Sequence, residues 1–177
     1  SESGYFIFNT LLFLIGGFLV MWMAAGFAML ETGLVRSKNA STQLLKNVAL
    51  FSLASIAYFI VGFNLMYPGD GWIINGWMGG FSLTGLEPAG VGADGVDLTY
   101  ASVGSDFFFQ LMFCAATASI VSGTVAERVK LWPFLIFTIV LTGIFYPISA
   151  SWQWGGGWLS EAGFSDFAGS TVVHATG

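Results

Sequence analysis

The sequence contains very few charged residues. Of its 177 residues only 8% are Asp, Glu, Lys or Arg, against about 25% in ordinary soluble domains. Five basic residues are too few for a protein that neutralises nucleic-acid phosphates. The hydrophobic fraction of 55% is too high for a disordered chain or a free soluble domain. The composition therefore predicts a membrane protein.

Cysteine and histidine are almost absent. A single cysteine, Cys114, excludes a disulfide within the chain and cannot by itself build a zinc or iron–sulfur site. The only histidine is His174, with no Cys-x-x-Cys or acidic helix motif to complete a ligand set. We therefore expect neither a metal nor a cofactor.

The sequence contains long stretches without charged residues. A hydrocarbon core takes about 20 residues of helix, and four stretches are long enough to cross it. They are Tyr5–Leu30, Asn47–Tyr67, Phe107–Ala126 and Leu131–Trp154, and a fifth begins at Phe167 and is still uncharged at Gly177. We expect an all-α, polytopic helical bundle with four complete transmembrane helices and the start of a fifth. The approximate helices are 5–35, 40–67, 105–127, 130–154 and 167–177.

The charges predict the orientation of these helices. All five basic residues lie in two places, between the first and second spans and between the third and fourth: Arg36, Lys38, Lys46, Arg128 and Lys130. Short loops that keep Lys and Arg face the cytoplasm, so the N-terminus and the loops 68–104 and 155–166 lie outside. Most acids fall on that outer side: Glu2, Asp70, Glu87, Asp94, Asp97, Asp106, Glu161 and Asp166. They either solvate the loops or form a field that gathers cations.

The third span carries two different faces. Phe109 and Phe113 are four residues apart and so project from one side of a helix. Small side chains at the same spacing, Ala115, Ser119 and Gly123, would let another helix approach closely. The two rings either line a path or pack in a core or against lipid.

The fourth span ends in an aromatic, glycine-rich segment. Pro147 removes a backbone hydrogen bond and is expected to kink the helix. Trp154 is followed by three glycines, which let a ligand or another helix come close. An indole face beside bare carbonyls would suit a small cation.

The fifth segment places an acid and an imidazole on one expected helix. Asp166 stands where a helix N-cap would be, so it has a structural as well as a functional interpretation. His174 follows eight residues later, about 12 Å along a helix axis and close to the bilayer midplane. Ionisable groups at that depth are costly and usually mark a pathway or proton relay.

Three motifs resemble those of the ammonium transporter family (Amt/Mep/Rh). They are Glu31–Asn39 (ETGLVRSKN), Gly123–Arg128 (GTVAER) and Asp166–His174 (DFAGSTVVH). Their order and spacing agree over nearly the whole chain, and the last is the most specific. Ser170 departs from the pattern, where glycine is more frequent.

The resemblance implies eleven transmembrane helices in two inverted five-helix repeats, with the N-terminus outside and one pore in each subunit of a homotrimer. This chain would be a fragment covering most of the first repeat. Phe109 and Phe113 would close the outer mouth of the pore. Trp154, Phe113 and Asp166 would form the external ammonium site, and His174 would be the first histidine of a central pair.

The resemblance also implies a multi-pass protein of the plasma (inner) membrane and a PII-type regulatory protein at its cytoplasmic face. The expected function is channel-like ammonium or ammonia transport rather than catalysis. The alternative is an ammonium sensor fused to a cytoplasmic signalling module. An intramembrane enzyme would need a partner for His174, and only Cys114 is at hand.

Overall fold

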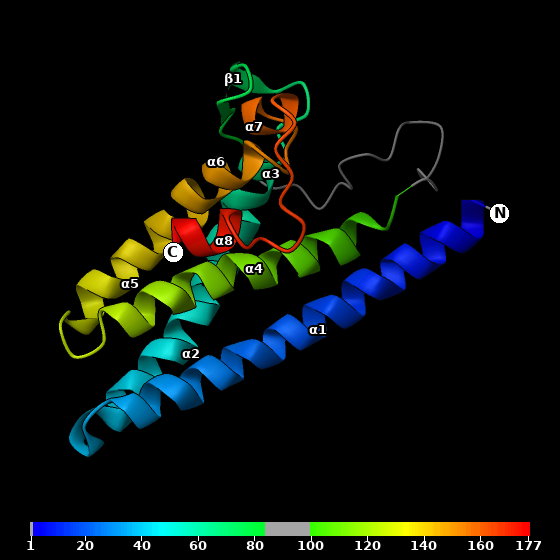
Figure 1. The fold of residues 1–177 in the computed structure, drawn as a ribbon. Helices are drawn as coiled ribbons and strands as arrows, with labels where there is room; N and C mark the ends of the chain where they lie inside the picture. Colours follow the sequence, from blue (N-terminus) through cyan, green and yellow to red (C-terminus); the bar gives the residue numbers. More distant parts are fainter. Residues whose placement is uncertain (1, 84–99) are drawn as a thin grey trace.

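The computed structural model describes residues 2–83 and 100–177 and is a bundle of helices with one short hairpin (Figure 1). Four helical segments are long and apolar enough to cross a membrane: Ser3–Leu34, Ser37–Met66, Val103–Thr124 and Leu131–Ser151. The prediction of a helical protein is confirmed, and the described residues contain four candidate membrane spans. Glu87, Asp94 and Asp97, expected in the outer loop, lie outside the described residues.

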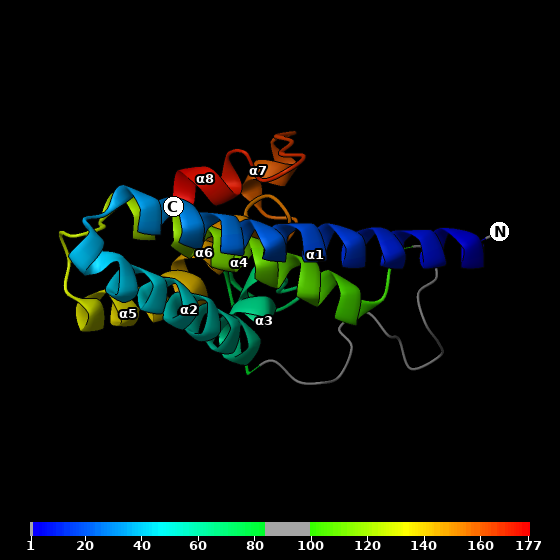
Figure 2. The same ribbon diagram turned by 90° about the horizontal axis from the view of Figure 1, so that it is seen from below.

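The first span, α1 (Glu2–Leu34), runs alongside the third, α4 (Val103–Thr124) (Figures 1 and 2). Glycines of α1 allow this close approach. A Cβ on Gly16 would lie 2.7 Å from Cε2 of Phe109, and one on Gly17 would meet the ring of Phe108. The stripe expected on α4 also faces α1 at one point, because a Cβ on Gly123 would lie 3.4 Å from the Glu31 carboxylate.

The second and fourth spans each change their helical winding midway. In the second, α2 (Ala40–Ala57) passes through a π-helical turn, Tyr58–Gly62, into α3 (Phe63–Met66). In the fourth, α5 (Leu131–Val140) passes through the π-helical turn Leu141–Phe145 into α6 (Tyr146–Ser151).

The two π-helical turns pack against each other at a glycine. A Cβ on Gly62 would lie 3.1 Å from both Cγ of Pro147 and the carbonyl oxygen of Thr142. The distortion expected at Pro147 thus takes the form of a wide turn just before the proline, where the missing N–H disturbs the hydrogen-bond ladder.

Three tryptophans join the loops at one end of the bundle. The strands β1 (Trp72–Ile74) and β2 (Met78–Gly79) form a hairpin whose Trp77 ring stacks 4.7 Å from that of Trp158, in α7 (Trp158–Glu161). The indole N–H of Trp152 donates to the carbonyl of Trp77 at 2.8 Å. We call Trp77, Trp152 and Trp158 the tryptophan cap.

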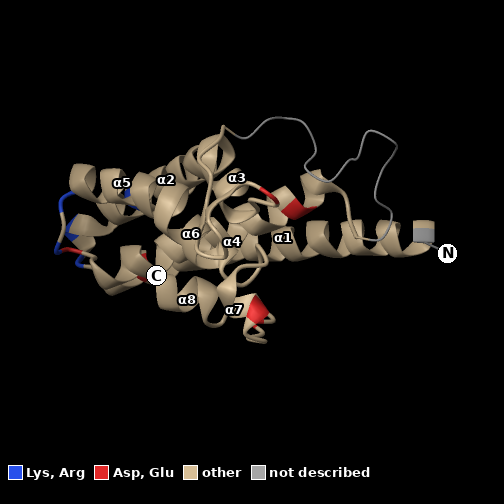
Figure 3. Ribbon diagram, turned by 90° about the horizontal axis from the view of Figure 1, so that it is seen from above, with Lys and Arg blue, Asp and Glu red and all other residues tan. Residues whose placement is uncertain are grey.

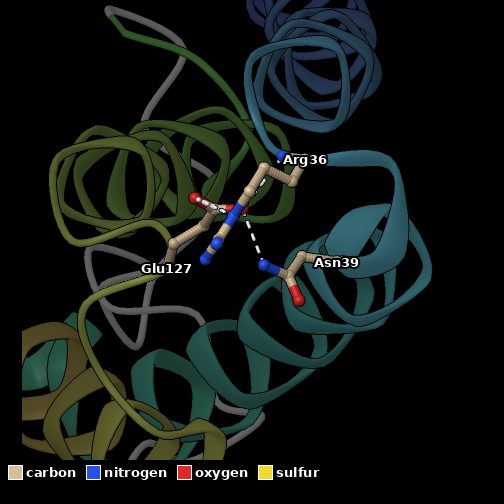
Figure 4. Close-up of polar contacts among 3 residues, drawn as sticks. All are labelled: Arg36, Asn39 and Glu127. Carbon is tan, nitrogen blue, oxygen red and sulfur yellow. Dashed lines mark hydrogen bonds and ion pairs between the residues drawn. The ribbon is translucent and has the colours of Figure 1, made fainter.

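The basic residues gather at the opposite end of the bundle from the N-terminus (Figure 3). There Glu127 joins the two connecting loops, accepting from the side chain of Asn39 at 2.6 Å and from the backbone and guanidinium of Arg36 at 2.9 and 3.2 Å (Figure 4). The hydrogen bonds from Asn39 and Arg36 lower the pKa of Glu127 to about 2. Glu127 holds a left-handed backbone (φ 62°), which is uncommon outside glycine and which these contacts help to keep.

A buried polar cluster joins α1, α2 and α4 near that end. One carboxylate oxygen of Glu31 accepts from Gln43, from Asn47 at 2.8 Å and from Ser122 at 2.8 Å. Lys46 donates to the carbonyl of Ser122 at 2.9 Å. Glu31 is only 3% exposed, so its carboxylate is hydrogen-bonded by these donors rather than by water. We call these five residues the Glu31 cluster.

Candidate functional site

An apolar cavity of about 510 Å³ lies between α1, α4 and the segment that follows α6. Most of its wall is aromatic, which suits a small cation better than a large polar solute. The cavity is lined by Leu12, Phe13, Gly16, Tyr67, Tyr100, Phe109, Gln110, Phe113, Trp154, Phe167 and Ala168. Three of the predicted site residues, Phe109, Phe113 and Trp154, are therefore brought together.

The two predicted gate residues are in direct contact. The rings of Phe109 and Phe113 meet edge to face with centroids 4.9 Å apart. Phe109 is also stacked on Phe13 of α1 at 5.0 Å, over the space left by Gly16. Phe109 is thus held on two sides, while Phe113 follows it one helical turn along the cavity wall.

A hydrogen bond to the segment that contains Asp166 fixes the position of Trp154. Its indole N–H donates to the backbone carbonyl of Asp166 at 3.2 Å. Of the glycines that follow, Gly155 packs against the carbonyl of Met66 and Gly157 against that of Gly76. At these two positions the glycines admit neighbouring chain segments.

Asp166 is 5% exposed and uses its carboxylate within its own segment. It accepts from the hydroxyl of Ser170 at 3.2 Å and from the backbone N–H groups of Thr171 and Val172 at 3.0 and 2.7 Å. Burial raises the pKa of Asp166, but these hydrogen bonds outweigh it and hold the pKa below its usual value. The carboxylate therefore stays charged and accepts from the backbone N–H groups at the start of the next helix, whose N-cap residue is Thr171.

That helix is shorter than expected. The sequence predicts a helix over 167–177, but α8 is Val172–Thr176, and residues 167–171 form turns. The prediction for its start is wrong, because Gly169 adopts a left-handed backbone (φ 75°) that interrupts a right-handed helix. The helical rise of about 12 Å between Asp166 and His174 consequently does not apply.

His174 lies in α8, which packs against α4 and α6. Its side chain is exposed and is not part of the cavity wall. Cys114, its only conceivable reactive partner, is buried and donates to the carbonyl of Thr142 at 3.4 Å. Within the described residues, no three His, Cys, Asp or Glu side chains are grouped as a metal site would require.

The sequence pattern does not single out three polar members of the cavity wall, Tyr67, Tyr100 and Gln110. Burial and then the negative charge of Asp106 raise the pKa of Tyr67 well above its usual value and that of Tyr100 to about 12. Both phenols are therefore neutral. The one signal in the sequence is Gln110 itself, a polar residue next to Phe109 in an apolar stretch.

Comparison with known sequences gives one consistent family. A sequence model described as the Ammonium Transporter Family matches residues 11–177. Ammonium transporter Amt2 of Archaeoglobus fulgidus is 44% identical, over 93% of this chain and 35% of that protein. An ammonium transporter of Bacillus subtilis is 36% identical, over 88% of this chain and 38% of its own length.

Similar solved structures include Amt and Mep2 proteins, in agreement with the sequence comparison. The structure of a protein named "Sensor Amt Protein" has a TM-score of 0.86 and 34% identity, over 98% of this chain and 42% of that one. Mep2 of Saccharomyces cerevisiae has a TM-score of 0.77 and 26% identity, over 94% and 36%. The chain spans about 35–42% of the length of these four relatives.

Proposed function

Because the chain belongs to the ammonium transporter family, we propose that the protein conducts ammonium or ammonia across a membrane and that the aromatic cavity is its external recruitment site. The observation that supports this best is the meeting of Phe109, Phe113 and Trp154 around one cavity. Aromatic faces attract a cation through their quadrupoles, which contributes about 0.5–2 kcal/mol.

The proposed path starts with an ammonium ion against Trp154, held in a field to which the charged Asp166 contributes. An unpaired ion faces a large desolvation barrier in a hydrocarbon interior, and loss of one proton removes most of that barrier. Ammonia then passes the ring of Phe113 and moves along a hydrophobic pore beside His174. The released proton is passed along separately and rejoins ammonia on the far side, so that one net charge crosses the membrane. Potassium has no proton to lose, so deprotonation also supplies selectivity.

The remaining architecture follows the same resemblance. We propose that the chain is part of the first inverted repeat of an eleven-helix fold, with the N-terminus and the tryptophan cap outside. The concentration of basic residues at the other end supports a cytoplasmic location for that end. The plasma (inner) membrane, a homotrimer and a PII-type regulator at the basic end belong to the same proposal.

A sensor that uses the same site is the alternative function. The observation in its favour is that the similar "Sensor Amt Protein" is named as a sensor. The relatives from A. fulgidus and B. subtilis are named as transporters, which favours transport.

The test is ammonium-driven current in proteoliposomes that contain the full-length protein. Wild type should carry current with ammonium and little with potassium. Trp154→Leu should weaken the discrimination, since the cation–π contact is lost. A protein that inserts and assembles but carries no ammonium current would contradict the proposal.

A further inference from the structure

Two buried hydrogen-bond acceptors of α4, one of them in the cavity wall, have no donor among the residues that the structure describes. Oδ1 of Asp106 and Oε1 of Gln110 are buried, and within the described part of the chain neither has a hydrogen-bond partner. Each residue is only 7% exposed. A buried acceptor without a donor costs about 1–3 kcal/mol, so two of them on one helix need an explanation.

The two acceptors belong to the same face of α4. Asp106 is in its first turn and Gln110 is four residues later, so their side chains lie one above the other. Gln110 lines the cavity together with Phe109 and Phe113. Asp106 is not itself part of the cavity wall, but helical spacing puts it on the face of α4 that also carries Phe109, Gln110 and Phe113.

Capping of α4 does not explain Asp106. An acid in the first turn of a helix often serves the free backbone N–H groups there. In α4 the hydroxyl of Ser102 already accepts from the backbone N–H of Ser105 at 3.2 Å. Oδ1 of Asp106 takes no part in this cap.

We infer that Asp106 and Gln110 form a second, acidic side of the cation site, where they accept N–H groups from an ammonium ion held against the aromatic wall. The inference rests on the proposed function and adds specificity to it. Ammonium presents four N–H donors, and the aromatic rings satisfy none of them as strongly as a carboxylate does. Potassium has the same charge but no N–H donor, so a preference of these acceptors for ammonium comes from directed hydrogen bonds and not from charge.

The experiment is a titration of ammonium-induced current in proteoliposomes with matched amounts of the full-length protein. Asp106→Asn keeps the shape and removes the charge. It should raise the half-saturating ammonium concentration about tenfold, equivalent to about 1.4 kcal/mol. Gln110→Met keeps most of the volume and removes the neutral acceptor, and should raise it about threefold. The second variant keeps the inference testable if the first does not assemble.

Glu161→Gln is the matched control, because it removes another outer acid that is exposed and not part of the cavity wall. It should leave the half-saturating concentration unchanged. If Asp106→Asn and Gln110→Met behave like this control, or lower only the maximal current, the inference is wrong. Absence of ammonium current in wild type would instead refute the proposed function.

Discussion

The indole N–H of Trp154 donates to the backbone carbonyl of Asp166 at 3.2 Å. A hydrogen bond therefore joins the predicted aromatic wall to the segment that carries the predicted acid, although Trp154 and Asp166 lie twelve positions apart in the sequence. The Asp166 carboxylate is turned the other way, to Ser170 and the N–H groups of Thr171 and Val172. The start of α8 thus sets the position of the Trp154 ring.

Gly169 gives a test of this coupling. It holds φ 75°, and an added Cβ would lie 2.5 Å from Cγ2 of Val173 and 3.0 Å from Cη2 of Trp154. Gly169→Ala should displace the ring, change the tryptophan fluorescence response to ammonium and raise the half-saturating concentration several-fold. Gly156→Ala is the matched control, because it has the same backbone strain (φ 77°) and nothing within 4 Å. Equal behaviour of the two variants would show that strain alone is responsible.

The sequence predicts the four spans well because charge-free runs leave a chain little alternative in a membrane. It also predicts that Phe109 and Phe113 share a face, since that follows from helical geometry alone. It does not predict the start of α8. The Asp166 carboxylate accepts from the backbone N–H groups of Thr171 and Val172, five and six residues later, because the left-handed backbone of Gly169 makes a turn between them.

The polar partners in the interior cannot be predicted from one segment at a time. Glu31 and Ser122 meet although 91 residues separate them. Tyr67, directly after α3, and Tyr100, shortly before α4, meet in the cavity wall although they lie 33 positions apart in the sequence. Such contacts depend on how the helices pack, which the sequence pattern of a single helix does not specify.

The Glu31 cluster should contribute strongly to stability. Glu31→Ala would leave the donors of Gln43, Asn47 and Ser122 without their acceptor and Lys46 without a nearby negative charge. We expect a loss of about 3 kcal/mol, as for the breaking of other buried charged networks. Thermal unfolding of the full-length protein in detergent measures it, with the exposed Glu161→Ala as control. Equal midpoints for the two variants would contradict the expectation.

The contact between the π-helical turns should tolerate no extra carbon at Gly62. A Cβ there would lie 2.6 Å from Cδ2 of Tyr58 and 3.1 Å from the Thr142 carbonyl oxygen. Gly62→Ala should destabilise the protein by about 1–3 kcal/mol through overpacking. Gly26→Ala, in α1 with nothing within 4 Å, should be neutral or slightly stabilising. The measurement is the thermal unfolding midpoint of both variants, and an unchanged midpoint for Gly62→Ala would contradict the tight contact.

The Glu127 junction should respond to acid. Hydrogen bonds from Asn39 and Arg36 lower the pKa of Glu127 from 4.5 to about 2. A lowered pKa in the folded state stabilises the protein above the ordinary value, and this contribution is lost as the pH falls from about 4.5 through about 2. Glu127→Gln should therefore have a lower thermal unfolding midpoint than wild type at pH 7, and the difference between the two midpoints should shrink toward pH 2. A gap independent of pH would contradict the assignment.

His174 tests whether the end of the chain contributes to conduction. It is exposed in α8, and its side chain makes no hydrogen bond among the described residues, so its removal breaks no such bond there. In the full-length protein, His174→Ala should lower ammonium current or increase potassium leak while the amount of inserted protein stays the same. A structural role predicts the reverse, a loss of protein or assembly with unchanged current per molecule. Proteoliposomes loaded with matched amounts of protein separate the two outcomes. Unchanged current and unchanged potassium leak would exclude His174 from the path, leaving selectivity to the cavity of Trp154 and Phe113.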